Sequence, residues 1–137
     1  MPSPATAARL ADAILALHVG VVAFVVLGTV AIVVGGIRRW RWVRGRRWRT
    51  THLALVAFIA LQAWLGRLCP LTAWEQALRA QAGQGAYATS FVEHWLSRLI
   101  FFHAPWWVFV AAYSAFVLLV AACWRLVPPR ASHGGRR

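Results

Sequence analysis

The arginine-rich segment 37–49 constrains this sequence more than any other feature. It holds seven of the chain's fifteen basic residues and three of its nine tryptophans, and it joins two apolar stretches. Short arginine-rich loops stay on the cytoplasmic side of a membrane, and indole rings favour the headgroup region. The segment therefore predicts a membrane protein in which residues 38–49 face the cytoplasm.

Composition places the chain in the same class. It is 61% hydrophobic and 13% charged, whereas soluble domains carry about twice that share of charge. Three stretches hold no Asp, Glu, Arg or Lys: Ala13–Ile37, Thr50–Gly66 and Leu99–Trp124. Since a span needs about 20 apolar residues, we expect three transmembrane helices, at about 9–36, 51–68 and 105–126. The first stretch is too long for a secretory signal and is expected to be a retained anchor.

The distribution of charge predicts the orientation. With the loop inside, eleven arginines lie on the cytoplasmic side and four outside. The outer four are Arg9, Arg67, Arg79 and Arg98. An excess of this size predicts a multi-pass membrane protein with the N-terminus outside and the C-terminus in the cytoplasm.

The formal net charge of +12 also raises the possibility of nucleic-acid binding. Because the proposed topology divides the basic residues between two sides, we expect no nucleic-acid partner. Anionic lipid headgroups are a nearer source of phosphate. The arginines expected to contact them are Arg38, Arg39, Arg41, Arg44, Arg46, Arg47 and Arg49.

The predicted organisation is one helical membrane domain, 9–126, between disordered termini at 1–8 and 127–137. On the first span, small residues recur at helical spacing at Ala13, Ala16, Gly20 and Ala23, a pattern that allows close helix packing in lipid. The fold class is an all-α integral membrane bundle of three transmembrane helices with a short helical hairpin on the outer face.

That hairpin is expected in the outer region 69–104. Thr72 with Glu75, and Ser90 with Glu93, match the capping box that begins a helix. Gly83 marks the end of the first short helix, 73–82, on which Glu75 and Arg79 form an i,i+4 pair. The second helix, 91–103, is too short and too charged to cross the bilayer, so we expect it to be re-entrant or to lie at the interface.

The two cysteines are predicted to lie at opposite sides of the membrane and so cannot pair with each other. Cys69 follows the second span on the outer side, and Cys123 lies near the inner end of the third. In an oxidising compartment Cys69 is a candidate reactive thiol. The simpler expectation for it is a small, buried apolar residue.

Several short motifs together resemble a known bacterial membrane family. They are Cys69-Pro70-Leu71-Thr72, Glu75, Leu78-Arg79, Ala82-Gly83, Tyr87, Phe91, Glu93-His94, Leu10-Ala11-Asp12, His18, Phe24 to Gly28, and His52-Leu53. On these residues the chain resembles the family called domain of unknown function 2784, from about Arg9 to Val120. It departs from that pattern at Ala73, Arg98 and Phe102, where the family has prolines. The resemblance implies a small multi-helix inner-membrane protein and brings no established activity, substrate or cofactor.

Ionisable groups at membrane depth are candidate functional residues. They form an expected polar cluster of Asp12, His18, Cys69, Glu75, Glu93 and His94. Imidazole is a common metal and haem ligand, so His18, His94 and Cys69 are candidate metal ligands. For haem the candidates are His18 and His94, with His52 less suitable because it lies deeper and towards the cytoplasm. No close-spaced pair such as H-x3-H occurs, so we expect no cofactor, with haem or a transition metal as the alternative.

Three hypotheses for function follow from the sequence. No G-x-S-x-G motif and no P-loop occurs, so the first is a non-enzymatic helical module that associates with itself or with a larger membrane complex. The second is a metal- or haem-binding redox protein that uses His18, His94 and Cys69. The third is a proton or small-solute pathway along Asp12, Gln62 and the histidines.

Overall fold

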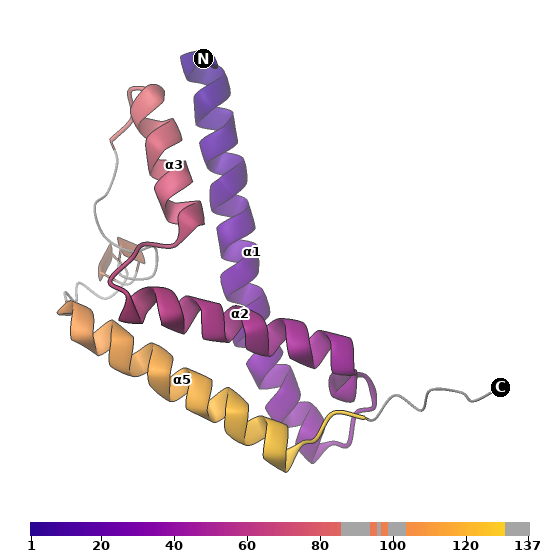
Figure 1. Cartoon of the computed structure of the whole chain (residues 1–137). Helices are drawn as coiled ribbons and strands as arrows, with labels where there is room; N and C mark the ends of the chain where they lie inside the picture. The colour runs from indigo at the N-terminus through magenta and orange to yellow at the C-terminus, as the bar shows by residue number, and fades with distance from the viewer. Residues whose placement is uncertain (86–93, 96, 99–103, 131–137) are drawn as a thin grey trace.

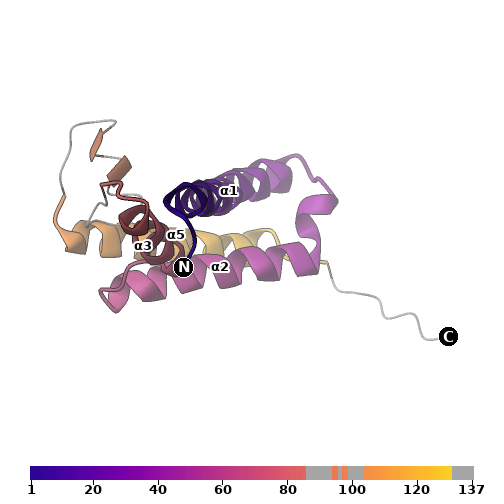
Figure 2. The ribbon, with the colours of Figure 1, turned by 90° about the horizontal axis from the view of Figure 1, so that it is seen from above.

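The computed structural model describes residues 1–85, 94–95, 97–98 and 104–130, and over these ranges it is helical without strands. The elements are α1 (Pro4–Ile37), the short 3-10 helix η1 (Trp42–Arg44), α2 (Arg46–Trp64), α3 (Pro70–Gln81) and α5 (Trp106–Leu126). Helices α2 and α5 lie side by side, α1 crosses them, and α3 packs along the N-terminal half of α1 (Figure 1). Seen from above, α1 lies over one side of the α2–α5 pair (Figure 2).

Hydrogen bonds at both ends of the α2–α5 pair show that the two helices run antiparallel. At one end the indole Nε1 of Trp106 donates to the carbonyl oxygen of Ala63, at 3.0 Å. At the other end Nη2 of Arg49 donates to the carbonyl oxygen of Cys123, at 2.9 Å. Arg49 is fully buried and its guanidinium lies 5.5 Å from the ring centre of Trp124. It therefore joins two helices, and the expectation that it contacts lipid headgroups is not met.

Two helices, α1 and α5, are long and apolar enough to cross a membrane by length and composition. The sequence led us to expect three. Helix α2 falls short because it begins at Arg46 and takes Arg46, Arg47 and Arg49 into its first turn. The prediction that this helix begins at 51 was wrong. Arginine is a good helix former, so the helix begins directly after Gly45 and includes the arginines.

Helix α2 also ends earlier than expected. Leu65 caps it, and Gly66 adopts a left-handed backbone conformation with φ +64°, which costs glycine little. The amide of Arg67 donates back to the carbonyl oxygen of Gln62 at 3.0 Å, closing the helix end. Pro70 occupies the first turn of the next helix, α3, where its missing N–H costs nothing.

The termini are more ordered than expected where the structure describes them. Helix α1 begins at Pro4, because the Ser3 hydroxyl accepts a hydrogen bond from the amide of Thr6 at 3.3 Å. Near the other terminus, the amide of Arg130 donates to the carbonyl oxygen of Arg44 at 2.9 Å. The expected disorder of 131–137 lies outside the described residues.

Helix α1 crosses α2 most closely at Gly28. Nε2 of His52 donates to the carbonyl oxygen of Val25 at 2.9 Å, and the His52 ring stacks on Trp48 with 5.8 Å between ring centres. A Cβ atom at Gly28 would lie 2.8 Å from Cδ2 of His52. The glycine therefore allows a fully buried histidine to fit against α1.

The predicted row of small residues is not the row that packs inside the chain. Ala13, Ala16 and Gly20 are exposed, and a Cβ atom at Gly20 would meet nothing within 4 Å. The buried positions of α1 are instead Ala7, Ala11, His18, Val25, Gly28, Thr29, Ile32 and Gly35. On the N-terminal side of the crossing in α1, Val25 packs with Val56 and Val120 in a core to which three helices contribute.

We predict that Gly28→Ala destabilises the protein by about 1–3 kcal/mol, because the new methyl group forces His52 or a helix to move. Gly20→Ala is the matched control on the same helix, and it should be neutral or stabilising by up to about 1 kcal/mol because alanine favours helix. Thermal unfolding in detergent measures both. Equal effects of the two substitutions would contradict this account of the helix crossing.

Candidate functional site

A buried acid and a shared arginine connect α3 to α1. The Glu75 side chain is 1% exposed, and its Oε1 lies 2.8 Å from Nε of Arg79, one turn along α3. Nη2 of the same arginine lies 3.2 Å from Oδ1 of Asp12 on α1, and Nη1 donates to Oε1 of Gln84 at 3.0 Å. One guanidinium therefore contacts both acids that the described residues contain.

The i,i+4 pair of Glu75 and Arg79 was predicted correctly, but the capping role of Thr72 and Glu75 was wrong. Helix α3 begins three residues earlier, with Cys69 at the N-cap and Pro70 in the first turn. Glu75 is thereby released to pair with Arg79. The hydrogen bond to Glu75 raises the pKa of Arg79 above its ordinary value, so the guanidinium stays charged at any physiological pH.

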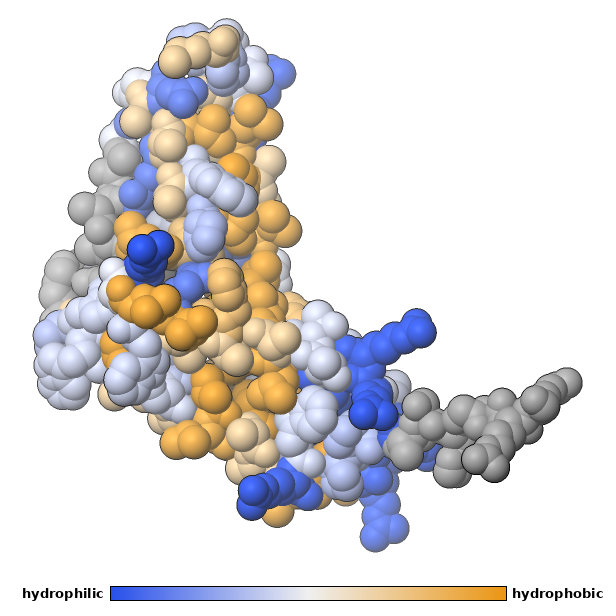
Figure 3. All heavy atoms as spheres, viewed as in Figure 1, coloured by the Kyte–Doolittle hydropathy of each residue, from blue (hydrophilic) through white to orange (hydrophobic). Residues whose placement is uncertain are grey.

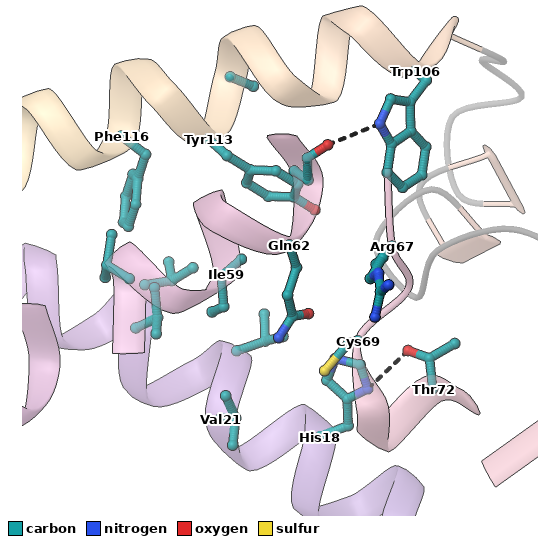
Figure 4. Close-up of a pocket in the computed structure, with 16 residues that line it drawn as sticks. His18, Val21, Ile59, Gln62, Arg67, Cys69, Thr72, Trp106, Tyr113 and Phe116 are labelled. Carbon is teal, nitrogen blue, oxygen red and sulfur yellow. Dashed lines mark hydrogen bonds between the residues drawn. The ribbon is translucent and has the colours of Figure 1, made fainter. Parts of the chain in front are cut away.

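His18 meets α3 on the same side of α1. Its Nδ1 lies 3.5 Å from Oγ1 of Thr72, and both side chains are buried (Figure 4). Electrostatic interaction also couples His18 to Glu75. Three members of the expected polar cluster, Asp12, His18 and Glu75, are therefore gathered at the α1–α3 contact.

An apolar cavity of about 350 Å³ lies beside this contact, between α1, α2 and α5. Its polar lining gathers towards the α3 end, where Figure 4 shows His18, Gln62, Arg67, Cys69 and Thr72. Valines, Ile59 and Phe116 line the rest, and Phe116 packs against the Val25 core. The cavity is therefore polar at one end and hydrocarbon-like at the other.

Gln62 lines this cavity with a buried amide. Its amide nitrogen Nε2 is buried, and within the described part of the chain it has no hydrogen-bond partner. Leaving a buried donor unpaired costs about 1–3 kcal/mol. Figure 4 shows this amide pointing into the polar end of the cavity, towards Cys69 and His18.

The candidate metal ligands are only partly brought together. Cys69 and His18 line the same cavity, whereas the His94 ring lies edge-on to Trp95, 5.6 Å between ring centres. Among the residues that the structure describes, no group of three or more His, Cys, Asp or Glu side chains is placed to hold a metal ion. Glu93 and the predicted capping box at Ser90 lie outside the described residues, as does most of the predicted helix 91–103.

The remaining candidate residues, His52 and Cys123, are buried in helix packing. His52 is buried in the α1–α2 crossing and does not line the cavity, so it is an interhelical histidine. Cys123 is buried near the end of α5, and neither cysteine is in a disulfide. Sequence reasoning missed Arg67, Tyr113 and Trp106 as members of the site. Arg67 follows α2 and the other two lie on α5, and no local motif connects these two segments.

These features define a small, all-helical protein with two helices that could cross a membrane and a polar cluster beside an apolar cavity. The chain belongs to the DUF2784 family, described as proteins of unknown function, because the family model matches residues 8–129. The resemblance seen in the sequence is thereby confirmed. No curated protein and no solved structure matches the chain.

Removing the shared guanidinium should loosen the α1–α3 contact. We predict that Arg79→Gln destabilises the protein by about 3 kcal/mol, because the Glu75 carboxylate stays buried without its cation. Asp12→Asn should cost below about 1 kcal/mol, since the Asp12 side chain is 69% exposed. Combining Arg79→Gln with Glu75→Gln should recover part of the lost stability. Thermal unfolding of the wild type, the two single variants and the double variant tests this order of stabilities.

Proposed function

We propose that the chain is a multi-pass protein of the bacterial inner membrane that works as a non-enzymatic helical module. The observation that carries this proposal is the exposure of its most apolar helices. Only 28% of the most hydrophobic window of α1, and 17% of that of α5, is buried within the chain. Core helices of a water-soluble domain bury most of such a surface, so lipid is the solvent that fits these helices.

The distribution of charge supports an orientation with the arginine segment in the cytoplasm. The hydrogen bonds of Arg49 and Arg130 place the 38–49 segment beside the C-terminal end of α5. Hydrophilic side chains accordingly gather at that end in Figure 3. The acids Asp12 and Glu75 belong to the α1–α3 contact, away from that end.

Tryptophans support the same placement. Trp42 is exposed at the arginine-rich end, and Trp64 and Trp107 are exposed at the opposite end of the α2–α5 pair. Indole rings gather at both headgroup regions of a spanning bundle. Helix α2 is about 28 Å long and α5 about 32 Å, close to the hydrocarbon thickness of about 30 Å. We therefore place α2 beside α5, with Arg46 and Arg47 at the headgroups and the apolar part from His52 to Trp64, about 20 Å long, in the hydrocarbon region.

Contact with anionic headgroups at the cytoplasmic face is part of this proposal. A shallow groove on the first turns of α2 is lined by Arg46, Arg47, Thr50 and Thr51. Guanidinium and hydroxyl groups together suit a phosphate. Arg49 points inward to α5 and is not part of this surface.

The role that fits such a module is association with itself or with a larger membrane complex. The exposed small residues Ala13, Ala16 and Gly20 support it, because they leave a side of α1 on which another helix could approach closely.

Thiol labelling tests the orientation. In intact cells a membrane-impermeant maleimide should modify Cys69, which is partly exposed, in a Cys123→Ala background. Thr50→Cys, in a chain without the native cysteines, should react only after the membrane is permeabilised, because Thr50 is exposed beside the arginine segment. Labelling of the two sites from the same side would overturn the topology.

Cysteine cross-linking tests association. In native membranes Ala16→Cys, without the native cysteines, should form disulfide-linked dimers or a cross-link to a partner. Val33→Cys is the control, since it is also exposed but lies about 100° around the helix from Ala16. A monodisperse monomer that cross-links at neither position would contradict the proposed role.

A further inference from the structure

We propose that the cavity between α1, α2 and α5 binds one single-chain lipid with a carboxylate head, a long-chain fatty acid. The carboxylate would lie at Gln62 and Arg67, and the hydrocarbon chain would extend towards Phe116. This site goes beyond the membrane module proposed above, and only its alignment with the bilayer rests on that proposal.

The apolar part of the cavity fits a hydrocarbon chain. It is lined by branched aliphatic side chains and by Phe116, and it ends against the core of Val25 and Val56. An apolar ligand gains about 0.8 kcal/mol for each methylene group that it buries. A volume of about 350 Å³ is near the lower limit of small-molecule sites, which begin at about 300 Å³, so one chain fits better than the two of a phospholipid.

The polar end supplies hydrogen-bond donors that need an acceptor. The amide Nε2 of Gln62 is buried without a partner in the described part of the chain. Arg67 lines the same end of the cavity (Figure 4) and, among the described residues, has no ion-pair partner. An amide donor and a guanidinium around one site together favour a head group with anionic oxygens.

The charge balance favours a carboxylate. The two acids among the described residues, Glu75 and Asp12, share the guanidinium of Arg79, so neither is paired with Arg67. A single guanidinium matches the one negative charge of a carboxylate, whereas a phosphate monoester carries about −1.5 to −2 at pH 7. Thr72 supplies a hydroxyl at the same end.

The positions of the polar and apolar ends of the cavity agree with a lipid of the outer leaflet. In the proposed orientation Arg67 and Cys69 lie near the outer surface, and Phe116 lies deeper, towards the cytoplasm. A fatty acid in that leaflet has its head outward and its chain inward. The ligand could therefore enter from the bilayer without being inverted.

Binding of radiolabelled palmitate to the purified full-length protein in detergent tests the proposal. We expect saturable binding, weakened about tenfold or more in Gln62→Leu and in Arg67→Gln, because each removes a hydrogen bond to a charged group. Gln76→Leu is the matched control, since Gln76 also has a buried Nε2 without a described partner but does not line the cavity. Hexadecanol, which lacks the charge, should bind more weakly than palmitate.

A second pair of variants tests the chain-binding part without touching polar groups. Ala112→Trp should fill the cavity and abolish binding, whereas Ala111→Trp, one position along α5 and outside the lining, should leave binding unchanged. Circular dichroism and size exclusion verify that each variant folds.

Absence of saturable binding, equal affinity for hexadecanol, or tighter binding of a single-chain lipid phosphate would overturn the proposal. Palmitate binding in detergent does not depend on the orientation in the membrane. The lipid proposal can therefore fail while the proposed topology holds, and the topology can fail while palmitate binding holds.

Discussion

The close approach of α1 to α2 at Gly28 and His52 sets the geometry of the rest of the molecule. In the membrane location that we propose, helices have no hydrophobic driving force towards each other, so packing depends on close contact and on hydrogen bonds. The His52 ring provides both, because it lies against the bare backbone of Gly28 and donates to the carbonyl oxygen of Val25. On the N-terminal side of this crossing α1 leaves the α2–α5 pair, and the space that opens holds α3 and the cavity.

The buried ionic cluster fixes α3 within that space. Burying Glu75 is expensive, and the cost is offset only while Arg79 remains beside it. Replacing such a pair with apolar side chains often leaves stability unchanged, so stability alone does not account for its presence. Its effect on geometry is more specific, since Arg79 also reaches Asp12 and thereby sets the position of α3 along α1. That position brings Thr72 to His18 and closes the polar end of the cavity.

What the sequence could predict depended on local or compositional signals. The arginine segment, the α3 helix with its Gly83 turn and the pair of Glu75 with Arg79 all follow from spacing within a few residues, and the structure contains them. The start of α2 was misjudged because arginines were taken as loop residues, although they also favour helix. Contacts such as Asp12 with Arg79 join residues far apart in sequence. Periodicity shows which face of a helix is apolar, but it does not identify the helix that covers that face.

The same reasoning explains why the polar lining of the cavity was missed and why its occupancy matters. The sequence indicated Gln62 only as a member of a possible proton or solute pathway, and only the three-dimensional arrangement shows that its amide is buried in a cavity that Arg67 also lines. A hydrocarbon chain gains van der Waals contact along apolar walls, and an acceptor head gives the buried amide of Gln62 a hydrogen bond. One ligand with a hydrocarbon chain and a carboxylate head therefore matches both ends of the cavity.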